Sequence, residues 1–226
     1  MSGVDETRRP RNVRSRIAIA VLAVAAASFA LIAEQVATAA PLIARDLQVS
    51  VWLHGHGNSA LTAFLLAVTR LHSTLCVLAM SFCAGLMVWR NGDRFHALWL
   101  ALALPGGLML NVALKHLFDR PRPAWDDPIL TLTTQSFPSG HATGATLFYG
   151  FLACYAVWRM KSAAARSLAI AACAGMVLLV GFSRIYLGVH YLSDVLASIC
   201  LGTAWLTACM IAARAIAGRG GAMATA

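Results

Sequence analysis

The sequence has few charged residues, and this scarcity decides the class of protein. Only 12% of the 226 residues are Asp, Glu, Lys or Arg, whereas 59% are hydrophobic and the mean hydropathy is +0.71. An ordinary soluble domain of this size does not have such a composition. The low charge therefore excludes a soluble globular protein and predicts a polytopic membrane protein.

Acidic residues are scarcer than basic ones, with 9 Asp and Glu against 18 Lys and Arg. The resulting net charge of +9 is compatible with a nucleic-acid partner. However, the sequence lacks a basic helix and has no basic patch interleaved with aromatic residues. Nucleic acid is therefore not an expected partner.

The sequence also lacks close pairs of cysteines. Its 6 cysteines lie in apolar stretches and form no CxxC pair, so we interpret them as small hydrophobic residues. His54 and His56 could bind a metal, but no third ligand is near them in the sequence and Gly55 disfavours a rigid site. We expect no disulfide framework, metal or cofactor. The cysteines are Cys76, Cys83, Cys154, Cys173, Cys200 and Cys209.

Six apolar windows are long enough to cross the ~30 Å hydrocarbon core of a membrane. They cover roughly residues 17–37, 73–89, 95–114, 141–158, 167–183 and 192–213. No length remains for a separate soluble domain. We therefore predict an all-α fold with one six-span domain at 17–214, an arginine-rich tail at 1–16 and a second tail at 215–226.

Basic residues indicate how the spans are oriented. Clusters of them precede the first window and follow the second, fourth and sixth, and the positive-inside rule places those segments in the cytoplasm. Both termini are then cytoplasmic, and the connections 115–140 and 184–191 lie outside. In a bacterium this predicts an inner-membrane protein whose active site faces the periplasm. The basic residues are Arg8, Arg9, Arg11, Arg14, Arg16, Arg90, Arg94, Arg159, Lys161, Arg166, Arg214 and Arg219.

The stretch 183–194 places Arg184, His190 and Asp194 between two apolar runs. Ionisable groups at a membrane boundary are costly, so they are functional candidates. His190 and Asp194 are four residues apart and share one face of a helix, where the carboxylate can accept the Nδ1 proton and leave Nε2 basic. This arrangement predicts an activated nucleophile or base. The alternative is a helix start with a satisfied histidine.

The connection 115–140 adds groups that suit a phosphoryl group. Lys115 and Arg122, together with Arg184, can neutralise phosphate oxygens. Ser139 and the backbone N–H of Gly140 precede a predicted helix, whose N-terminus attracts anions. Donors fixed in this way stabilise pentacoordinate phosphorus without a metal. These residues predict phosphoryl transfer, and on this reasoning either His141 or His190 could be the nucleophile.

Three motifs occur in order: Lys-x6-Arg-Pro at 115–123, Pro-Ser-Gly-His at 138–141 and Ser-Arg-x5-His-x3-Asp at 183–194. Together they resemble the type 2 phosphatidic acid phosphatase superfamily of integral membrane lipid phosphatases. The resemblance implies that His190 attacks phosphorus to give a phosphohistidine, that Asp194 orients His190, and that His141 protonates the leaving group. It also implies a set of phosphate-binding residues, namely Lys115, Arg122, Ser139, Gly140 and Arg184.

The expected function is metal-independent hydrolysis of a lipid phosphate or diphosphate on the outer face of the membrane. The resemblance implies a substrate such as undecaprenyl diphosphate, phosphatidylglycerol phosphate or phosphatidic acid. One alternative is a phosphotransferase that uses another acceptor than water. A lipid-phosphate transporter is a non-enzymatic alternative, which the lack of an evident internal repeat disfavours. The expected partners are the bilayer and its lipids, and the oligomeric state is left open.

Other residues carry smaller expectations. We expect Asn111 to bridge helices, and Tyr186 and Tyr191 to lie in the interfacial aromatic belt. Residues 41–71 have the pattern of an amphipathic segment in the outer interface. Arg120 could contact the substrate head group or only lipid phosphates.

Overall fold

The structure, a computed structural model, describes the backbone of residues 9–38 and 41–223 and the side chains of residues 15–38 and 41–215. Within the described backbone the chain is all-helical, as the sequence predicts, and forms no strand. The helices are α1 (Arg9–Ala37), α2 (Leu42–Gly55), α3 (Ser59–Leu71), α4 (Thr74–Arg90), α5 (Arg94–Phe118), α6 (Gly140–Arg159), α7 (Ala163–Tyr186) and α8 (Leu192–Met223).

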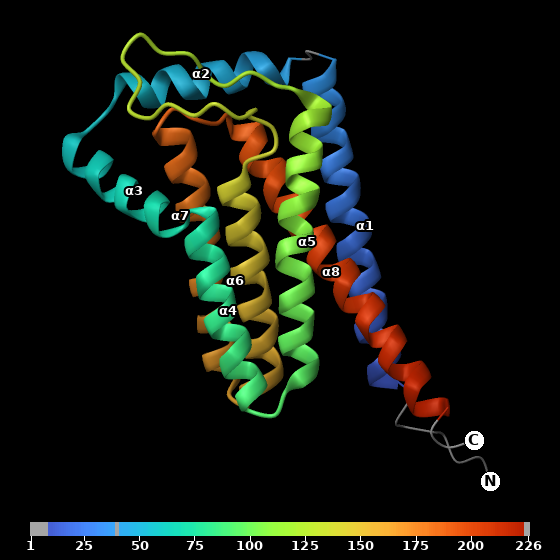
Figure 1. Cartoon of the computed structure of the whole chain (residues 1–226). Coiled ribbons are helices and arrows are strands. Elements are labelled where there is room, and N and C mark those ends of the chain that lie inside the picture. Colours follow the sequence, from blue (N-terminus) through green and yellow to red (C-terminus); the bar gives the residue numbers. More distant parts are fainter. Residues whose placement is uncertain (1–8, 39–40, 224–226) are drawn as a thin grey trace.

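Helices α4, α5, α7 and α8 form a bundle around α6 (Figure 1). Helix α6 contacts α4, α5, α7 and α8, and α1 packs along the outside of α8. Helix α2 lies across one end of the bundle, and α3 slopes from it towards the start of α4 (Figure 1). The bundle thus has one end covered by α2 and an opposite end without such a cover.

Where the bundle helices meet, large apolar side chains pack next to glycines. Trp99, Leu104, Leu147 and Phe151 belong to one buried cluster that joins α5 and α6. A Cβ on Gly107 would lie 2.6 Å from a Leu147 methyl group, so a side chain there would displace Leu147. Small residues let helix backbones approach closely in membranes, where packing drives association. This core fixes the axis of α6, at whose start His141 stands.

Local sequence sets where several helices begin. The side chains of Asn58, Ser73, Asp93 and Ser162 each accept a hydrogen bond from a backbone N–H in the first turn of α3, α4, α5 and α7. Such caps satisfy amide groups that a helix start leaves unpaired. Ser139 holds the same position before α6 but makes no capping bond. Its hydroxyl is therefore left for another partner.

Four helices are long and apolar enough to cross a membrane: Ser15–Ala37 within α1, α5, α7, and Leu192–Ala215 within α8. Helices α3 and α4, bent by 56° at a short break, add a fifth if the pair is one span. These helices make the chain an integral membrane protein. Helix α6 is not among them, because its first half carries polar and small residues that the bundle buries. The number of six spans stays a prediction.

Helix extends into both segments expected as tails. Helix α1 begins at Arg9, and α8 continues to Met223. The remaining parts of the expected tails, 1–8 and 224–226, lie outside the described residues.

Residues 41–71, expected to be amphipathic, form α2 and α3. On α2 the polar residues Asp46 and Ser50 are buried, whereas Leu47, Val51 and Trp52 are 53%, 54% and 62% exposed. Asp46 and Ser50 are four residues apart and therefore share the inner face. An apolar outer face is suited to the boundary of a bilayer. The helix thus buries Asp46 and Ser50 against the bundle, and its exposed face is mostly apolar but also carries Arg45 and Gln48.

Candidate active site

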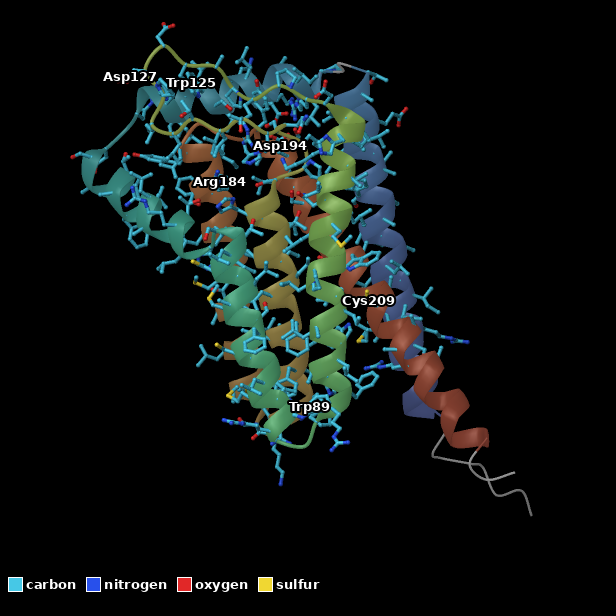
Figure 2. All side chains as sticks on the ribbon, in the orientation of Figure 1. Trp89, Trp125, Asp127, Arg184, Asp194 and Cys209 are labelled. Carbon is cyan, nitrogen blue, oxygen red and sulfur yellow. The ribbon has the colours of Figure 1, made fainter. Side chains whose placement is uncertain are left out.

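The predicted site residues gather at the end of the bundle that α2 covers. Arg184 near the end of α7 and Asp194 near the start of α8 lie there, and Trp125 and Asp127 of the connection 119–139 lie above them, whereas Trp89 marks the opposite end (Figure 2). The connections that carry the three motifs therefore meet at one place.

The start of α6 is joined directly to α8. The backbone N–H of Ser139 donates to the Asp194 carbonyl at 3.3 Å, and Ser198 Oγ donates to the Ser139 carbonyl at 2.9 Å. Asn111 of α5 donates to the Pro138 carbonyl at 3.3 Å and to a hydroxyl in α6 at 3.0 Å. The prediction that Asn111 bridges helices is thus confirmed, and its bridge holds the Pro-Ser-Gly-His motif in place.

His190 lies in the short connection between α7 and α8 and is 1% exposed. The chain turns at Gly188, whose φ of 71° lies in the left-handed region that favours glycine. A Cβ at Gly188 would lie 2.6 Å from the ring nitrogen of Trp125, which donates to the Gly188 carbonyl at 2.9 Å. Beyond this turn, the N–H groups of Val189 and His190 both donate to the Arg184 carbonyl. The backbone therefore fixes His190 next to Arg184.

The partners of the His190 ring identify its tautomer. Nδ1 lies 3.3 Å from Asp194 Oδ2, and Nε2 lies 3.1 Å from Arg122 Nη1. A guanidinium can only donate, so Nε2 must accept and is unprotonated. The single ring proton is then on Nδ1, directed at the Asp194 carboxylate. His190 is therefore a neutral imidazole with a basic Nε2, which is the form a nucleophile requires.

The surroundings favour this charge state. Burial is the largest of the effects that bring the pKa of His190 down to about 3; Asp194 opposes it, and the Arg122 and Arg184 cations add to it. Burial also lowers the pKa of Arg122 from its ordinary value, and Asp194 opposes that shift. An arginine nevertheless remains charged in a protein. At neutral pH the site therefore combines a neutral His190 with a cationic Arg122.

Asp194 is fully buried, and both of its carboxylate oxygens are engaged. Oδ2 accepts from the backbone N–H of Tyr191 at 2.9 Å and from Ser136 Oγ. Oδ1 accepts from Arg120 Nη1 at 2.6 Å. A buried charge persists when it is paired and hydrogen-bonded. These contacts hold Asp194 where it can accept the proton of His190 Nδ1.

Arg122 and Lys115 both contact the connection 119–139. Lys115 Nζ donates to the Gln135 carbonyl. Besides His190, the guanidinium of Arg122 donates to Thr134 O at 2.6 Å, Val189 O at 2.7 Å, Thr134 Oγ1 at 2.9 Å and Gln135 O at 3.1 Å. The two cations of the first motif therefore hold the connection against the bundle, and Arg122 lies beside His190.

Two buried donors at the site have no hydrogen-bond partner among the described residues, namely Ser139 Oγ and Arg184 Nε. Arg184 is 1% exposed, and its Nη1 donates to Thr69 Oγ1 of α3. Buried polar groups are normally paired, so such orphans call for an explanation. A hydroxyl, a guanidinium and the first amide groups of α6, beginning with Gly140, together form a set of donors for an anion.

His141 stands in the first turn of α6 and is partly exposed. Its ring makes no hydrogen bond with the described residues. The next residue, Ala142, packs against Ile185 and Val195 on either side of the His190 turn. The second histidine is therefore near the first and free to contact a bound group, while its role in proton transfer stays a prediction.

Arg120 occupies a different place from the one expected, because it faces neither a head group nor lipid. It is 7% exposed and pairs with Asp46 Oδ2 at 2.9 Å and with Asp194 Oδ1 at 2.6 Å. Its guanidinium also lies 4.3 Å from the centre of the Tyr191 ring. Two buried carboxylates require a cation between them, and this requirement draws Arg120 inward.

The predicted aromatic belt is wrong for Tyr186. This side chain is 4% exposed, and its hydroxyl accepts from the Asn58 N–H at 2.8 Å, which ties α7 to the start of α3. Tyr191 is half-buried beneath Arg120, and burial raises the pKa of its hydroxyl. Both rings therefore pack within the protein, where their polar atoms or faces have specific partners.

Three buried residues of this site escape motif-based reasoning: Asp46, Ser136 and Ser193. Each contacts Arg120, Asp194 or both. The one available signal is the rarity of acidic residues, which makes Asp46 conspicuous in a mostly apolar segment. Within the described residues, no group of three or more His, Cys, Asp or Glu is placed to hold a metal ion. His54 instead stacks on Trp125, with ring centres 4.1 Å apart.

The sequence profile of the PAP2 superfamily matches residues 96–216, more than half of the chain and all three motifs. The chain belongs to the PAP2 superfamily. This confirms the resemblance drawn from the motifs.

Two curated relatives of this PAP2 protein come from Bacillus subtilis (strain 168). Phosphatidylglycerophosphatase B is 33% identical over 120 residues, which cover 53% of this chain and 58% of the relative. Undecaprenyl-diphosphatase BcrC is 29% identical over 156 residues, which cover 65% of this chain and 73% of the relative. The match thus spans less than two thirds of the first relative and nearly three quarters of the second.

Solved structures share the fold of this PAP2 protein. The transmembrane PAP2 type phosphatidylglycerolphosphate phosphatase from Bacillus subtilis superimposes with a TM-score of 0.77 at 24% identity, covering 84% of this chain and 94% of that one. Aquifex aeolicus LpxE superimposes with a TM-score of 0.58 at 21% identity, covering 73% and 93%. These similarities concern the arrangement of the helices.

Proposed function

We propose that this PAP2 protein is a membrane lipid phosphatase that passes the phosphoryl group of a lipid phosphate or diphosphate first to His190 and then to water. One observation carries the proposal: His190 Nδ1 lies 3.3 Å from Asp194 Oδ2 and Nε2 lies 3.1 Å from Arg122 Nη1, which assigns the ring proton to Nδ1 and leaves Nε2 free to attack. The relatives named as phosphatidylglycerophosphatase and undecaprenyl-diphosphatase support the reaction class.

In the first step, Nε2 of His190 forms a bond to phosphorus while the bond from phosphorus to the leaving oxygen breaks. His141 donates a proton to that oxygen as it departs. The ring of His190 becomes positively charged, and the Asp194 carboxylate stabilises this charge through Nδ1. The products of this step are a phosphohistidine and either the lipid alcohol, from a lipid phosphate, or the lipid monophosphate, from a diphosphate.

In the second step, a water molecule attacks the phosphorus and the bond to Nε2 breaks. His141, now neutral, accepts a proton from the water, and inorganic phosphate leaves. His190 returns to its neutral form with Nδ1–H directed at Asp194. His141 thus acts as acid and then as base, which leaves it unchanged over one cycle.

The charge that develops on the phosphoryl oxygens is stabilised by groups of the chain itself. The orphan donors Ser139 Oγ and Arg184 Nε, together with the Gly140 N–H, would contact these oxygens. Lys115 and Arg122 are two further cations, both close enough to interact electrostatically with Arg184. Three cations supply the electrostatic role that a metal has in other phosphoryl-transfer enzymes, so we propose no metal or cofactor.

The proposal includes six spans for residues 17–214, with α4 and α6 as spans and both termini cytoplasmic. The distribution of Lys and Arg over the connections supports this orientation. The apolar outer face of α2 supports placing the covered end of the bundle at the outer boundary of the bilayer. In a bacterial inner membrane, the site would face the periplasm.

A lipid substrate is proposed because the site lies at the end of a membrane bundle, where a head group arrives laterally. Phosphatidylglycerol phosphate and undecaprenyl diphosphate are the candidates that the names of the relatives favour. Chains held in the bilayer raise the local concentration of the head group and orient it. Binding energy from these remote parts can then lower the barrier at phosphorus.

The experiment measures phosphate release by the purified protein in mixed micelles. The substrates are a long-chain lipid phosphate, its short-chain analogue and p-nitrophenyl phosphate, and His190→Ala is the inactive reference. We expect kcat/KM to fall in that order, with kcat falling as well as affinity. Equal values for the three substrates would refute the lipid specificity. Transfer of the phosphoryl group to another lipid without phosphate release would instead identify a phosphotransferase.

A further inference from the structure

Asp46 of α2 lies at the far end of a polar chain that leads to His190. Its side chain is 1% exposed although α2 is on the outside of the bundle. Oδ1 accepts from the backbone N–H of Ser193 at 2.9 Å, and Oδ2 accepts from Arg120 Nη2 at 2.9 Å and from Ser193 Oγ. A buried carboxylate with partners in the α5–α6 connection and in α8 is costly to maintain and indicates a specific role.

Arg120 divides its guanidinium between two carboxylates. Nη2 pairs with Asp46, while Nη1 donates to Asp194 Oδ1 at 2.6 Å and to Ser193 Oγ at 2.8 Å. A single cation is therefore shared by two anions, one in α2 and one in α8. Asp194 in turn holds the Nδ1 proton of His190. The charge on Asp46 thus acts on the ring through two intervening side chains.

We propose that Asp46 is a positioning residue for the proposed phosphoryl transfer. It shares Arg120 with Asp194 and so leaves Asp194 with enough negative charge to hold and polarise His190. The inference rests on the proposed function, because it concerns the reactivity of the same histidine. It adds a residue that lies outside all three motifs and belongs to the helix across the end of the bundle.

The physical reason is charge balance in a medium of low polarity. Without the Asp46 charge, Arg120 would pair with Asp194 alone, and the stronger pair would draw electron density away from the proton on His190 Nδ1. Coulombic interactions between buried groups are several times stronger than in water. The ring would then be less basic at Nε2 and less firmly oriented towards phosphorus.

The main test is Asp46→Asn, which keeps the size of the side chain and removes its charge. We expect kcat to fall about 10- to 100-fold, the range typical of residues that orient a reactive group through another residue. KM should change little, because Asp46 does not contact the substrate. The acid limb of kcat/KM should move to lower pH, since Asp194 then supports the protonated ring of His190 less strongly.

The matched control is Asp127→Asn, the same substitution on an exposed side chain of the 119–139 connection. It should leave kcat, KM and the pH profile unchanged. Asp46→Glu restores the charge and should recover part of kcat and return the acid limb towards its original position. A fall in kcat without any movement of the acid limb, or without rescue by glutamate, would mean a merely structural role and would overturn the inference.

A second variant keeps the test decisive where Asp46→Asn does not yield folded protein. Ser193→Ala removes the hydroxyl that contacts both Asp46 and Arg120 and keeps all three charges. We expect a smaller loss of kcat, with the acid limb in place and the protein folded by tryptophan fluorescence. A 10- to 100-fold fall in kcat in this variant, with all three charges kept, would show that packing and not charge carries the effect, and would overturn the inference.

His190→Ala in the same assay separates this inference from the proposed function. Phosphate release by the wild type but not by His190→Ala supports the proposed function. Wild-type kinetics in Asp46→Asn would then overturn the role of Asp46 alone. Phosphate release by His190→Ala would overturn both.

Discussion

Arg122 Nη1 lies 3.1 Å from His190 Nε2, so the atom proposed to attack phosphorus is hydrogen-bonded to a cation of the phosphate site. A phosphate oxygen is a stronger acceptor than an imidazole nitrogen, because it is charged. An entering phosphoryl group therefore competes for the same N–H. When the anion takes this N–H of Arg122, the lone pair of His190 Nε2 is released. His190 therefore becomes reactive when a substrate is present.

The first prediction concerns pH. His190 acts as a nucleophile only when it is neutral, and its pKa is brought down from 6.5 to about 3, mainly by burial. The neutral form is therefore present above that pKa and lost as the pH falls through it. We expect the limb of kcat/KM that belongs to His190 well below pH 6.5. The pKa of His141 is also lowered to about 3, mainly by burial and then by Arg184, so the proton that His141 donates must be held by the negative charge of a bound phosphate. Its loss gives the basic limb of a bell-shaped profile in kcat, which reports the substrate complex. The measurement is kcat and kcat/KM against pH.

Arg122→Gln gives a matched comparison, because the ionisation of the substrate is the same for both proteins. The Arg122 cation lowers the pKa of His190, so its removal should move the acid limb to higher pH. Activity should also fall, since the phosphate loses a bidentate partner. An acid limb at the same pH in both proteins would contradict the proximity of the two charges.

The second prediction separates the two histidines. His190→Ala should lower kcat by about 10⁴-fold or more and abolish the covalent phosphoenzyme, since it removes the nucleophile. His141→Ala should lower kcat by about 10²- to 10⁴-fold with a lipid substrate, the usual contribution of a general acid. With p-nitrophenyl phosphate, whose leaving group needs no proton, it should still form phosphoenzyme. The measurement is covalent labelling from radioactive substrate.

His116→Ala is the control for this pair, because the side chain is an exposed histidine near the end of α5. It should keep wild-type kcat and labelling. Covalent label retained by His190→Ala would show that another residue is the nucleophile.

The third prediction concerns metals. Lys115, Arg122 and Arg184 carry the positive charge of the proposed phosphate site, so activity should survive EDTA. Vanadate should inhibit in competition with substrate, because it adopts the pentacoordinate geometry of the transition state. Phosphate release with and without each reagent is the measurement. Complete loss on chelation, with recovery on adding Mg²⁺ or Zn²⁺, would contradict the mechanism.

The fourth prediction concerns sidedness. A reporter that is active only outside the cytoplasm should work when fused near Trp125, at the covered end of the bundle, and fail when fused near Lys161, between α6 and α7. The reason is the bias of Lys and Arg towards cytoplasmic connections. The measurement is reporter activity in whole cells, with expression of both fusions checked. The opposite pattern would invert the proposed topology.

The parts of the site that sequence can predict are those that depend on short spacing. His190 and Asp194 are four residues apart and do meet, although His190 lies in the connection before α8 and does not share a helix face with Asp194. Ser139 precedes α6 and Gly140 begins it, because an extended serine before a glycine-led apolar run is a helix boundary. The number of spans is harder to predict from the sequence. Neighbouring helices surround α6, so it can contain polar residues, and these lower the mean hydropathy by which a span is recognised.

The parts that sequence cannot predict depend on contacts between distant segments. Asp46 meets Ser193 across 147 residues, and Arg120 meets Asp194 across 74. No periodicity links such positions. Tyr186 was expected at the interface because tyrosine often lies there, but its partner in the structure is the start of α3, 128 residues away. In each case a buried polar group found a partner that only the assembled bundle supplies.

Because α2 buries Asp46 and exposes large apolar residues, the detergent used to extract the protein from the membrane should matter. Leu47, Val51 and Trp52 face outward, and Asp46 lies on the buried face of the same helix. During purification, whichever detergent replaces the lipid coats this face. Its head-group size and packing then act on a helix whose Asp46 is hydrogen-bonded to Arg120 and Ser193, next to the proposed active-site residue Asp194. Specific activity should accordingly vary among detergents even when the protein stays monodisperse, and reconstitution into vesicles becomes the proper reference state for kinetics.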